Sequence, residues 1–250
     1  MADVSVGIPV YNSAPFLDEL FACLRRLDPA PAEIVFVDDA STDDSASRID
    51  RFIGEFDRRT VRLLRNGSNL GIAGTYNRLV RETSSEWIQV LDADDLIVES
   101  NFLAQTAKYR QRGVDVVVAG LRSNAGFLNF CARVFGPVVP RYPPIWWPLL
   151  GSFATRAGVQ YRRERLLAQP FPDPAYPGSD IIHLLMLRSA GGCAYVRRAS
   201  VFYRVHRNAQ SSHERDYAAY RRELARWPAS VRRAHSLDLR MRQLGQRLAR

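Results

Sequence analysis

The chain carries its most diagnostic stretch at Ile88-Gln89-Val90-Leu91-Asp92-Ala93-Asp94-Asp95. This stretch begins as an apolar run typical of a buried strand and ends in three carboxylates within four residues. Open α/β sheets bind ligands beyond the carboxyl ends of their strands, and hard cations take oxygen ligands. The stretch therefore favours metal and phosphate chemistry over the alternative, an acidic turn that caps the next helix.

The first half of the chain alternates between strand and helix patterns. Apolar runs predict strands over residues 4–9, 33–37, 61–64, 87–91 and 114–119. Helical periodicity and cap residues predict helices over 15–27, from the cap residues 41–44 to about 56, over 69–82 and over 101–111. This alternation predicts an α/β fold in which helices flank a mostly parallel sheet, with a Rossmann-like nucleotide-binding half.

Polar and acidic residues follow three of these predicted strands. The first strand ends at Tyr11-Asn12, the second at Asp38-Asp39 and the fourth at residues 92–95. Parallel strands place their carboxyl ends at one edge of a sheet, so these side chains are expected to converge on one rim. Turn chemistry explains each group separately but not their convergence.

From about residue 120 the composition changes. Residues 135–148 contain five prolines with Trp146 and Trp147 among them, and a second proline-rich stretch covers 169–178. Prolines at this density exclude long helices and favour ordered loops lined by aromatic rings. The two tryptophans either stack on a sugar face or pack in a satellite core.

The overall composition is that of a soluble globular protein. The 250 residues are 46% hydrophobic and 24% charged, and we find neither a signal peptide nor an apolar stretch long enough to span a membrane. The cysteines Cys23, Cys131 and Cys193 have no spacing typical of a metal site or a disulfide framework. A reducing cytoplasm fits this pattern.

The net charge of +9 is concentrated in the C-terminal tail. Residues 214–250 hold ten arginines against four acidic residues, a net charge of +6. Leu237, Met241, Leu244 and Leu248 form an apolar stripe at helical spacing. Such a tail either docks on anionic lipid, packs back on the protein or mediates dimers, and a coding bias toward arginine is the plain alternative. No nucleic-acid-binding module accompanies it.

Four motifs in order resemble family 2 glycosyltransferases of the GT-A fold. They are Pro9-Val10-Tyr11-Asn12, Val37-Asp38-Asp39-Ala40-Ser41-Thr42-Asp43, Asn69-Leu70-Gly71 and Leu91-Asp92-Ala93-Asp94-Asp95. The resemblance continues through Tyr161-Arg162-Arg163, Phe171-Pro172-Asp173, the segment 180–191 and Tyr203-Arg204-Val205-His206. It covers roughly residues 4–212 and implies transfer of a sugar from a nucleotide sugar to an acceptor hydroxyl, with inversion.

The resemblance implies a divalent cation, Mn²⁺ or Mg²⁺, beside the donor diphosphate. It makes Asp94 the metal ligand and places Asp92 near either the donor ribose or the metal. His206 would approach from the C-terminal segment, and its imidazole would favour Mn²⁺. A lone histidine without this motif would be an ordinary surface or core residue.

The resemblance also assigns the donor-binding residues. Asp39, and secondarily Asp38, would accept a hydrogen bond from a ring N–H of the base, in a pocket walled by Pro9 and Tyr11. Such a carboxylate suits UDP-, dTDP- or GDP-linked sugars, with UDP-sugars favoured. The same turn is expected to cap the next helix through Ser41 and Thr42. Arg78 either points to the diphosphate or is a solvated surface residue.

Single-step inversion needs a base on the acceptor side of the sugar. By resemblance this base is Asp180, where the family has an acidic pair and this chain has Ser179-Asp180. The alternative is that Ser179 or Asp180 caps the helix that follows. The acceptor is expected to carry a hydroxyl and to be lipid-linked if the tail docks on a membrane.

The expected organisation has a nucleotide-sugar-binding half over 1–120, an acceptor-binding half over 121–213 and a basic helical tail over 214–250. A nucleotidyltransferase is a weaker alternative, because residues 11–15 lack the glycines and the basic residue that hold a triphosphate. A non-catalytic subunit that binds nucleotide sugars stays open, although the four residues Asp92, Asp94, Asp180 and His206 are all present.

Overall fold

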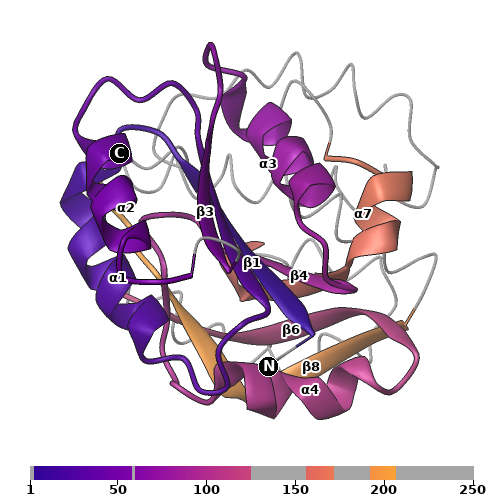
Figure 1. Ribbon diagram of the computed structural model, residues 1–250. Coiled ribbons are helices and arrows are strands. Elements are labelled where there is room, and N and C mark those ends of the chain that lie inside the picture. The colour runs from indigo at the N-terminus through magenta and orange to yellow at the C-terminus, as the bar shows by residue number, and fades with distance from the viewer. Residues whose placement is uncertain (1–2, 58–59, 125–155, 172–191, 207–250) are drawn as a thin grey trace, which may run out of the picture.

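The computed structural model describes residues 3–57, 60–124, 156–171 and 192–206 (Figure 1). Their strands form one eight-stranded sheet in the order β3-β2-β1-β4-β7-β6-β8-β5. Within these ranges, no helix has the length and the apolar character that a membrane span needs. The predicted helical tail and the proline-rich stretch 135–148 lie outside the described residues.

The first half contains every strand and helix that the sequence predicts, each within a few residues of its predicted bounds. The strands are β1 (Val4–Val10), β2 (Glu33–Asp38), β3 (Val61–Arg65), β4 (Trp87–Val90), β5 (Leu96–Ile97), β6 (Val114–Ser123), β7 (Val159–Arg162) and β8 (Gly192–Tyr203). The helices are α1 (Leu17–Arg25), α2 (Ser45–Ile53), α3 (Gly71–Glu82), α4 (Phe102–Arg110) and α7 (Arg163–Ala168). Short 3-10 turns, η1 (Ala14–Phe16) and η5 (Arg156–Gly158), precede α1 and β7.

The sheet is mostly parallel, as predicted. The pairings β1–β2, β1–β4, β2–β3 and β6–β8 are parallel. The other three are antiparallel, and β7 lies between β4 and β6 and runs against both. The parallel strands β3, β2, β1 and β4 are thus joined to β6 through one reversed strand, β7.

Helices cover both faces of the sheet (Figure 1). Apolar residues of α1, α2 and α4 pack into one core cluster with Val4, Val6 and Ile8 of β1. Residues of α3 and α7 form a second cluster with the alternate side chains of β2 and β4. Because both faces are covered, the central strands are buried along their whole length, which explains their continuous apolar runs.

Gly7 lets α3 lie close to β1. A Cβ atom built at this position would lie 3.4 Å from side-chain atoms of Leu79 and Ile88. The helix is therefore held against the sheet, and its first turns lie beside the carboxyl ends of the parallel strands. Those ends, with the segment that follows β8, frame the candidate site.

Candidate active site

Asn12 joins the loop after β1 to the turn after β2. Its side-chain oxygen accepts hydrogen bonds from the backbone N–H groups of Thr42 at 2.8 Å and Asp43 at 3.3 Å. Its own N–H donates to Ser41 Oγ at 3.0 Å. Asn12 and Ala40 both have left-handed backbone, with φ of 48° and 59°. The two strand ends are thus fixed to each other at the expected rim.

Of the residues 41–44 predicted to cap α2, Asp44 is at the cap position, but the prediction was wrong for Ser41 and Thr42. The helix begins at Ser45 after Asp44, so Ser41 and Thr42 lie in the loop and bond Asn12 instead. Asp43 is the side chain that bonds the helix start, with Oδ1 accepting from Ser45 N at 3.0 Å. Burial raises the pKa of Asp43, but hydrogen bonds from Ser45 and Ala14 outweigh burial and lower it.

The predicted base-pocket residues lie together around the end of β2. Pro9 is buried in β1 opposite Val37, whereas Tyr11 follows the strand and is 51% exposed. Asp38 and Asp39 are both 4% exposed. Among the described residues Asp38 Oδ1 has no hydrogen-bond partner, and its Oδ2 accepts a long bond of 3.4 Å from Ser41 N.

Asp39 is held by Leu70 of the Asn69-Leu70-Gly71 motif and by Asn66, which no motif singled out. Its Oδ1 accepts from Asn66 Nδ2 at 2.6 Å and from Leu70 N at 2.8 Å. Arg78 donates to the Asn66 side-chain oxygen and, at 2.8 Å, to the Arg65 carbonyl. Arg78 was expected either to point to the diphosphate or to be a solvated surface residue, and its described contacts support the Asp39 carboxylate through Asn66.

The three carboxylates that follow β4 have different surroundings. Asp92 is half-buried and accepts a hydrogen bond from the Tyr76 hydroxyl. Asp94 Oδ2 lies 2.8 Å from His206 Nε2, and the two side chains are 28% and 21% exposed. Asp95 is 1% exposed, and its Oδ1 accepts from Arg204 N at 3.0 Å. Asp95 thus bonds the segment after β8 and does not merely cap its own turn.

The segment 204–206 is held over the site by several elements. Asn124, just after β6, donates to the Val205 carbonyl and accepts from Val205 N, both at 2.8 Å. The Arg204 guanidinium pairs with Glu19 at 2.8 Å, and its hydrogen bond and charge lower the pKa of Glu19. The His206 ring packs on Phe16 at a centroid distance of 4.8 Å. His206 is therefore directed at Asp94 by contacts to η1, α1 and β6.

The pair Asp94 and His206 has the chemistry of a partial metal site. A carboxylate and an imidazole at 2.8 Å are both ligand types that Mn²⁺ accepts. Among the described residues, no group of three or more His, Cys, Asp or Glu side chains gathers as a full ligand set. An ion here would need further ligands from a bound diphosphate and water, which is common for such cations.

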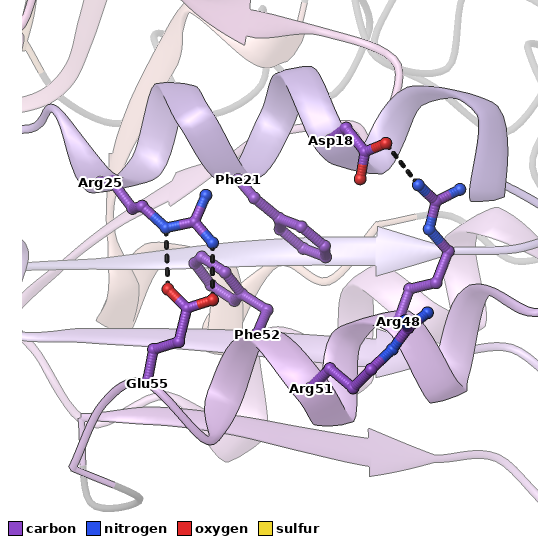
Figure 2. A pocket seen from close by; sticks show the side chains of 7 residues that line it. All are labelled: Asp18, Phe21, Arg25, Arg48, Arg51, Phe52 and Glu55. Carbon is purple, nitrogen blue, oxygen red and sulfur yellow. Dashed lines mark hydrogen bonds and ion pairs between the residues drawn. The ribbon is translucent and has the colours of Figure 1, made fainter.

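The predicted residues Asp180, Trp146 and Trp147 lie outside the described residues. A separate hollow of 380 Å³ lies between α1 and α2 (Figure 2). Two of its arginines form ion pairs, Arg25 with Glu55 and Arg48 with Asp18 (Figure 2). The rings of Phe21 and Phe52 also line the hollow. None of the predicted site residues that the structure describes lines it.

Comparison with known proteins agrees with this geometry. A family model described as Glycosyl transferase family 2 matches residues 5–166. The chain belongs to this family. Its family membership confirms the resemblance read from the motifs, and the match spans β1 to β7 together with both groups of strand-end carboxylates.

Two curated relatives illustrate the range of the family. Glycosyltransferase GlyG of Streptococcus pneumoniae serotype 4 is 30% identical over 115 residues, 46% of this chain and 38% of that protein. The undecaprenyl-phosphate 4-deoxy-4-formamido-L-arabinose transferase of Yersinia enterocolitica is 30% identical over 146 residues, 55% of this chain and 43% of that protein. The matches thus span less than half the length of either relative.

Solved structures confirm the predicted GT-A-type fold. The mannosyltransferase PcManGT from Pyrobaculum calidifontis, in complex with GDP-Man and Mn²⁺, superposes with a TM-score of 0.67 at 22% identity. The superposition covers 89% of this chain and 61% of that one. S. aureus TarS 1-349 in complex with UDP-GlcNAc gives 0.66 at 18% identity, over 89% and 65% of the chains.

Proposed function

We propose that the chain is a metal-dependent, inverting glycosyltransferase that moves a sugar from a nucleotide-diphosphate sugar to an acceptor hydroxyl. The observation that carries this proposal is the pair Asp94 and His206. These residues are 112 positions apart, yet their side chains lie 2.8 Å from each other at the rim that also holds Asp38 and Asp39. Side chains that can bind a metal and buried carboxylates that can accept hydrogen bonds from a nucleobase thus lie at one edge of the sheet.

The leaving diphosphate sets the main chemical demand on this site. Its departing negative charge must be balanced as the bond to the sugar breaks. A bound Mn²⁺ or Mg²⁺ would supply Lewis-acid stabilisation of that charge. Asp94 and His206 would hold the ion, and Asp92 would bind either the ion or the donor ribose. The position of His206 beside Asp94, at 2.8 Å, supports this assignment.

UDP-sugars are the preferred candidates for the donor, and dTDP- and GDP-sugars are the alternatives. Asp38 and Asp39 would accept the ring N–H of the base between Pro9 and the exposed ring of Tyr11. The unpartnered, buried Asp38 Oδ1 supports a ligand donor at this position. The UDP-GlcNAc in the TarS structure and the GDP-Man in the PcManGT structure support a nucleotide sugar without choosing its base.

The acceptor side rests on Asp180, which we propose as the base that takes the proton of the acceptor hydroxyl. The name of the Yersinia relative, an undecaprenyl-phosphate transferase, supports a lipid-linked acceptor. We therefore place the enzyme in the cytoplasm, at the membrane surface through its basic tail, in the synthesis of a polysaccharide, glycolipid or glycoconjugate.

Binding of nucleotide sugars tests the proposal directly. Purified protein is mixed with UDP-, dTDP- and GDP-sugars, with and without Mn²⁺, and thermal shift and slow donor hydrolysis are measured. At least one donor is expected to bind only with metal, and Asp94→Asn is expected to abolish that binding. Asp18→Asn is the matched control, because Asp18 is an exposed carboxylate on α1 whose described partner is Arg48. Absence of metal-dependent binding by every donor contradicts the proposal.

The role of Asp180 is tested with the same donors. Asp180→Asn is expected to leave donor binding unchanged and to remove transfer, because a base acts only on the acceptor. Loss of both donor binding and transfer in this variant would instead assign Asp180 a structural role. If transfer by Asp180→Asn equals that of wild type, Asp180 is not the acceptor-side base.

A further inference from the structure

Tyr76 joins the helix α3 to the carboxylate of Asp92. The tyrosine side chain is fully buried at 0% exposure, in the core cluster beneath α3. Its hydroxyl donates a hydrogen bond to Asp92 Oδ1, just beyond the end of β4. The hydroxyl of this buried aromatic residue thus bonds a carboxylate of the candidate site.

The ring of Tyr76 is fixed by the residues around it. The Phe171 ring packs on it at a centroid distance of 5.1 Å. Asn77, the next residue of α3, donates to the Phe171 carbonyl at 2.9 Å and accepts from Phe171 N at 2.8 Å. Close-packed side chains hold one rotamer, so the hydroxyl has a defined position from which to orient Asp92.

The same helix supports the other carboxylate of the rim. Arg78 binds the side-chain oxygen of Asn66, and the Asn66 amide donates to Asp39 Oδ1. Two residues of α3 therefore fix carboxylates at the ends of two different strands, β2 and β4. Tyr76 acts on Asp92 directly, whereas Arg78 acts on Asp39 through one intermediate.

We propose that Tyr76 is a positioning residue of the donor site, which holds the Asp92 carboxylate in the orientation that the nucleotide diphosphate and its metal require. This inference rests on the proposed function. A hydroxyl bonded to a charged carboxylate stabilises one orientation of that carboxylate. Without the hydroxyl, this contribution to the orientation of Asp92 is lost, and binding must supply it.

Tyr76→Phe tests the inference, because it removes the hydroxyl and keeps the ring. The probes are UDP and GDP with Mn²⁺, and their Kd values are measured by calorimetry. The Kd is expected to rise about tenfold, the loss of one hydrogen bond to a charged group. The urea midpoint of the ligand-free protein is expected to change little, because the ring packing on Phe171 is retained.

Val80→Ala is the matched control. It removes buried methyl groups one turn further along α3 and leaves the Tyr76 hydroxyl in place. This variant is expected to lower the urea midpoint more than Tyr76→Phe does, with a Kd within about twofold of wild type. If Tyr76 had only a structural role, Tyr76→Phe would lower the urea midpoint and leave the Kd unchanged.

Three results would overturn the inference. The first is a Kd for Tyr76→Phe within about twofold of the wild-type value. The second is an equal rise in Kd for Val80→Ala, which would mean that general loosening of α3 is responsible. Both leave the proposed function standing, since the wild type still binds. Failure of wild type to bind UDP, GDP and, as a third probe, dTDP with Mn²⁺ overturns the proposed function and this inference together.

Discussion

Ala40 follows the two buried aspartates and has a conformation that its side chain disfavours. Its φ of 59° is left-handed, a region that glycine enters freely and that alanine enters at a cost. Asn12 shares this geometry at φ 48°, but asparagine tolerates it better. The loops after β1 and β2 thus keep a strained backbone where the base pocket is proposed, a common feature of functional sites.

Replacing Ala40 with glycine is expected to stabilise the protein. Relief of the left-handed strain exceeds the extra entropy of glycine in the unfolded chain, so the free energy of unfolding is expected to rise by about 0.5–1 kcal/mol. Urea denaturation measures the change. Ala107→Gly in the interior of α4 is the control, with an expected loss of about 1 kcal/mol. A loss of stability in Ala40→Gly of the same size as in the control contradicts the expectation.

Among the elements, the parallel strands were predictable because burial on both faces leaves a continuous apolar run. β8 in the second half and the short β5 in the first half were missed, for different reasons. β8 carries Arg197-Arg198 within its span, and its pairing with β6 shifts register between Ala119↔Val196 and Gly120↔Ser200. A bulge of this kind interrupts the pattern that identifies a strand. β5 has only two residues and gives no pattern at all.

The sequence predicted the site residues that belong to motifs. It did not predict the residues that hydrogen-bond to those motif residues and hold them in place. The motifs led to Asp38, Asp39 and Asp94, and the structure places them at one rim. Asn66 and Tyr76 were missed, because one asparagine or one tyrosine has no sequence signal for the carboxylate that it holds. Only the packing of α3 on the sheet brings Tyr76 to Asp92, whereas Asn66 reaches Asp39 from the turn that follows β3.

The segment after β8 depends on β6 for its position, which predicts a defect at a distance from the metal ligands. Asn124→Ala removes both hydrogen bonds to Val205 and leaves Asp94 and His206 unchanged. His206 must then be ordered during binding, so the affinity for Mn²⁺ in the presence of UDP or GDP is expected to fall about three- to tenfold. Titration calorimetry measures this affinity.

The matched control for this variant is Arg122→Ala. Arg122 lies on β6, two residues before Asn124, and is exposed, but its ion pair goes to Glu99. Its removal is expected to leave the affinity unchanged, because exposed ion pairs contribute little. If both variants bind Mn²⁺ as wild type does, the two bonds of Asn124 do not position His206.

At the scale of the whole molecule, polar side chains at the amino end of the sheet hold the fold while those at the carboxyl end are placed for binding. Glu33, the first residue of β2, is 5% exposed and accepts from Ser5 Oγ at 2.7 Å and Ser84 Oγ at 2.8 Å. Arg62 of β3 donates to it at 3.0 Å. One carboxylate thus ties β1, β2, β3 and the end of α3 together.

This arrangement makes the stability of the protein depend on pH through Glu33. Burial raises the pKa of Glu33, but the hydrogen bonds from Ser5, Ser84 and Arg62 outweigh burial, so the pKa lies below its ordinary value. A depressed pKa in the folded state means that the carboxylate stabilises the fold fully above the unfolded pKa of about 4.3. That contribution is lost as the pH falls through the folded pKa.

Glu33→Gln is therefore expected to be less stable than wild type at neutral pH and to lose less of its stability on acidification. Urea midpoints measured between about pH 6 and pH 3 give both slopes. Glu55→Gln is the control, because the pKa of Glu55 is also lowered by Arg25 but this ion pair is half exposed and screened by water. The difference in slope from wild type is expected for Glu33→Gln alone. Identical slopes for wild type and Glu33→Gln would mean that other carboxylates govern the unfolding of the protein in acid.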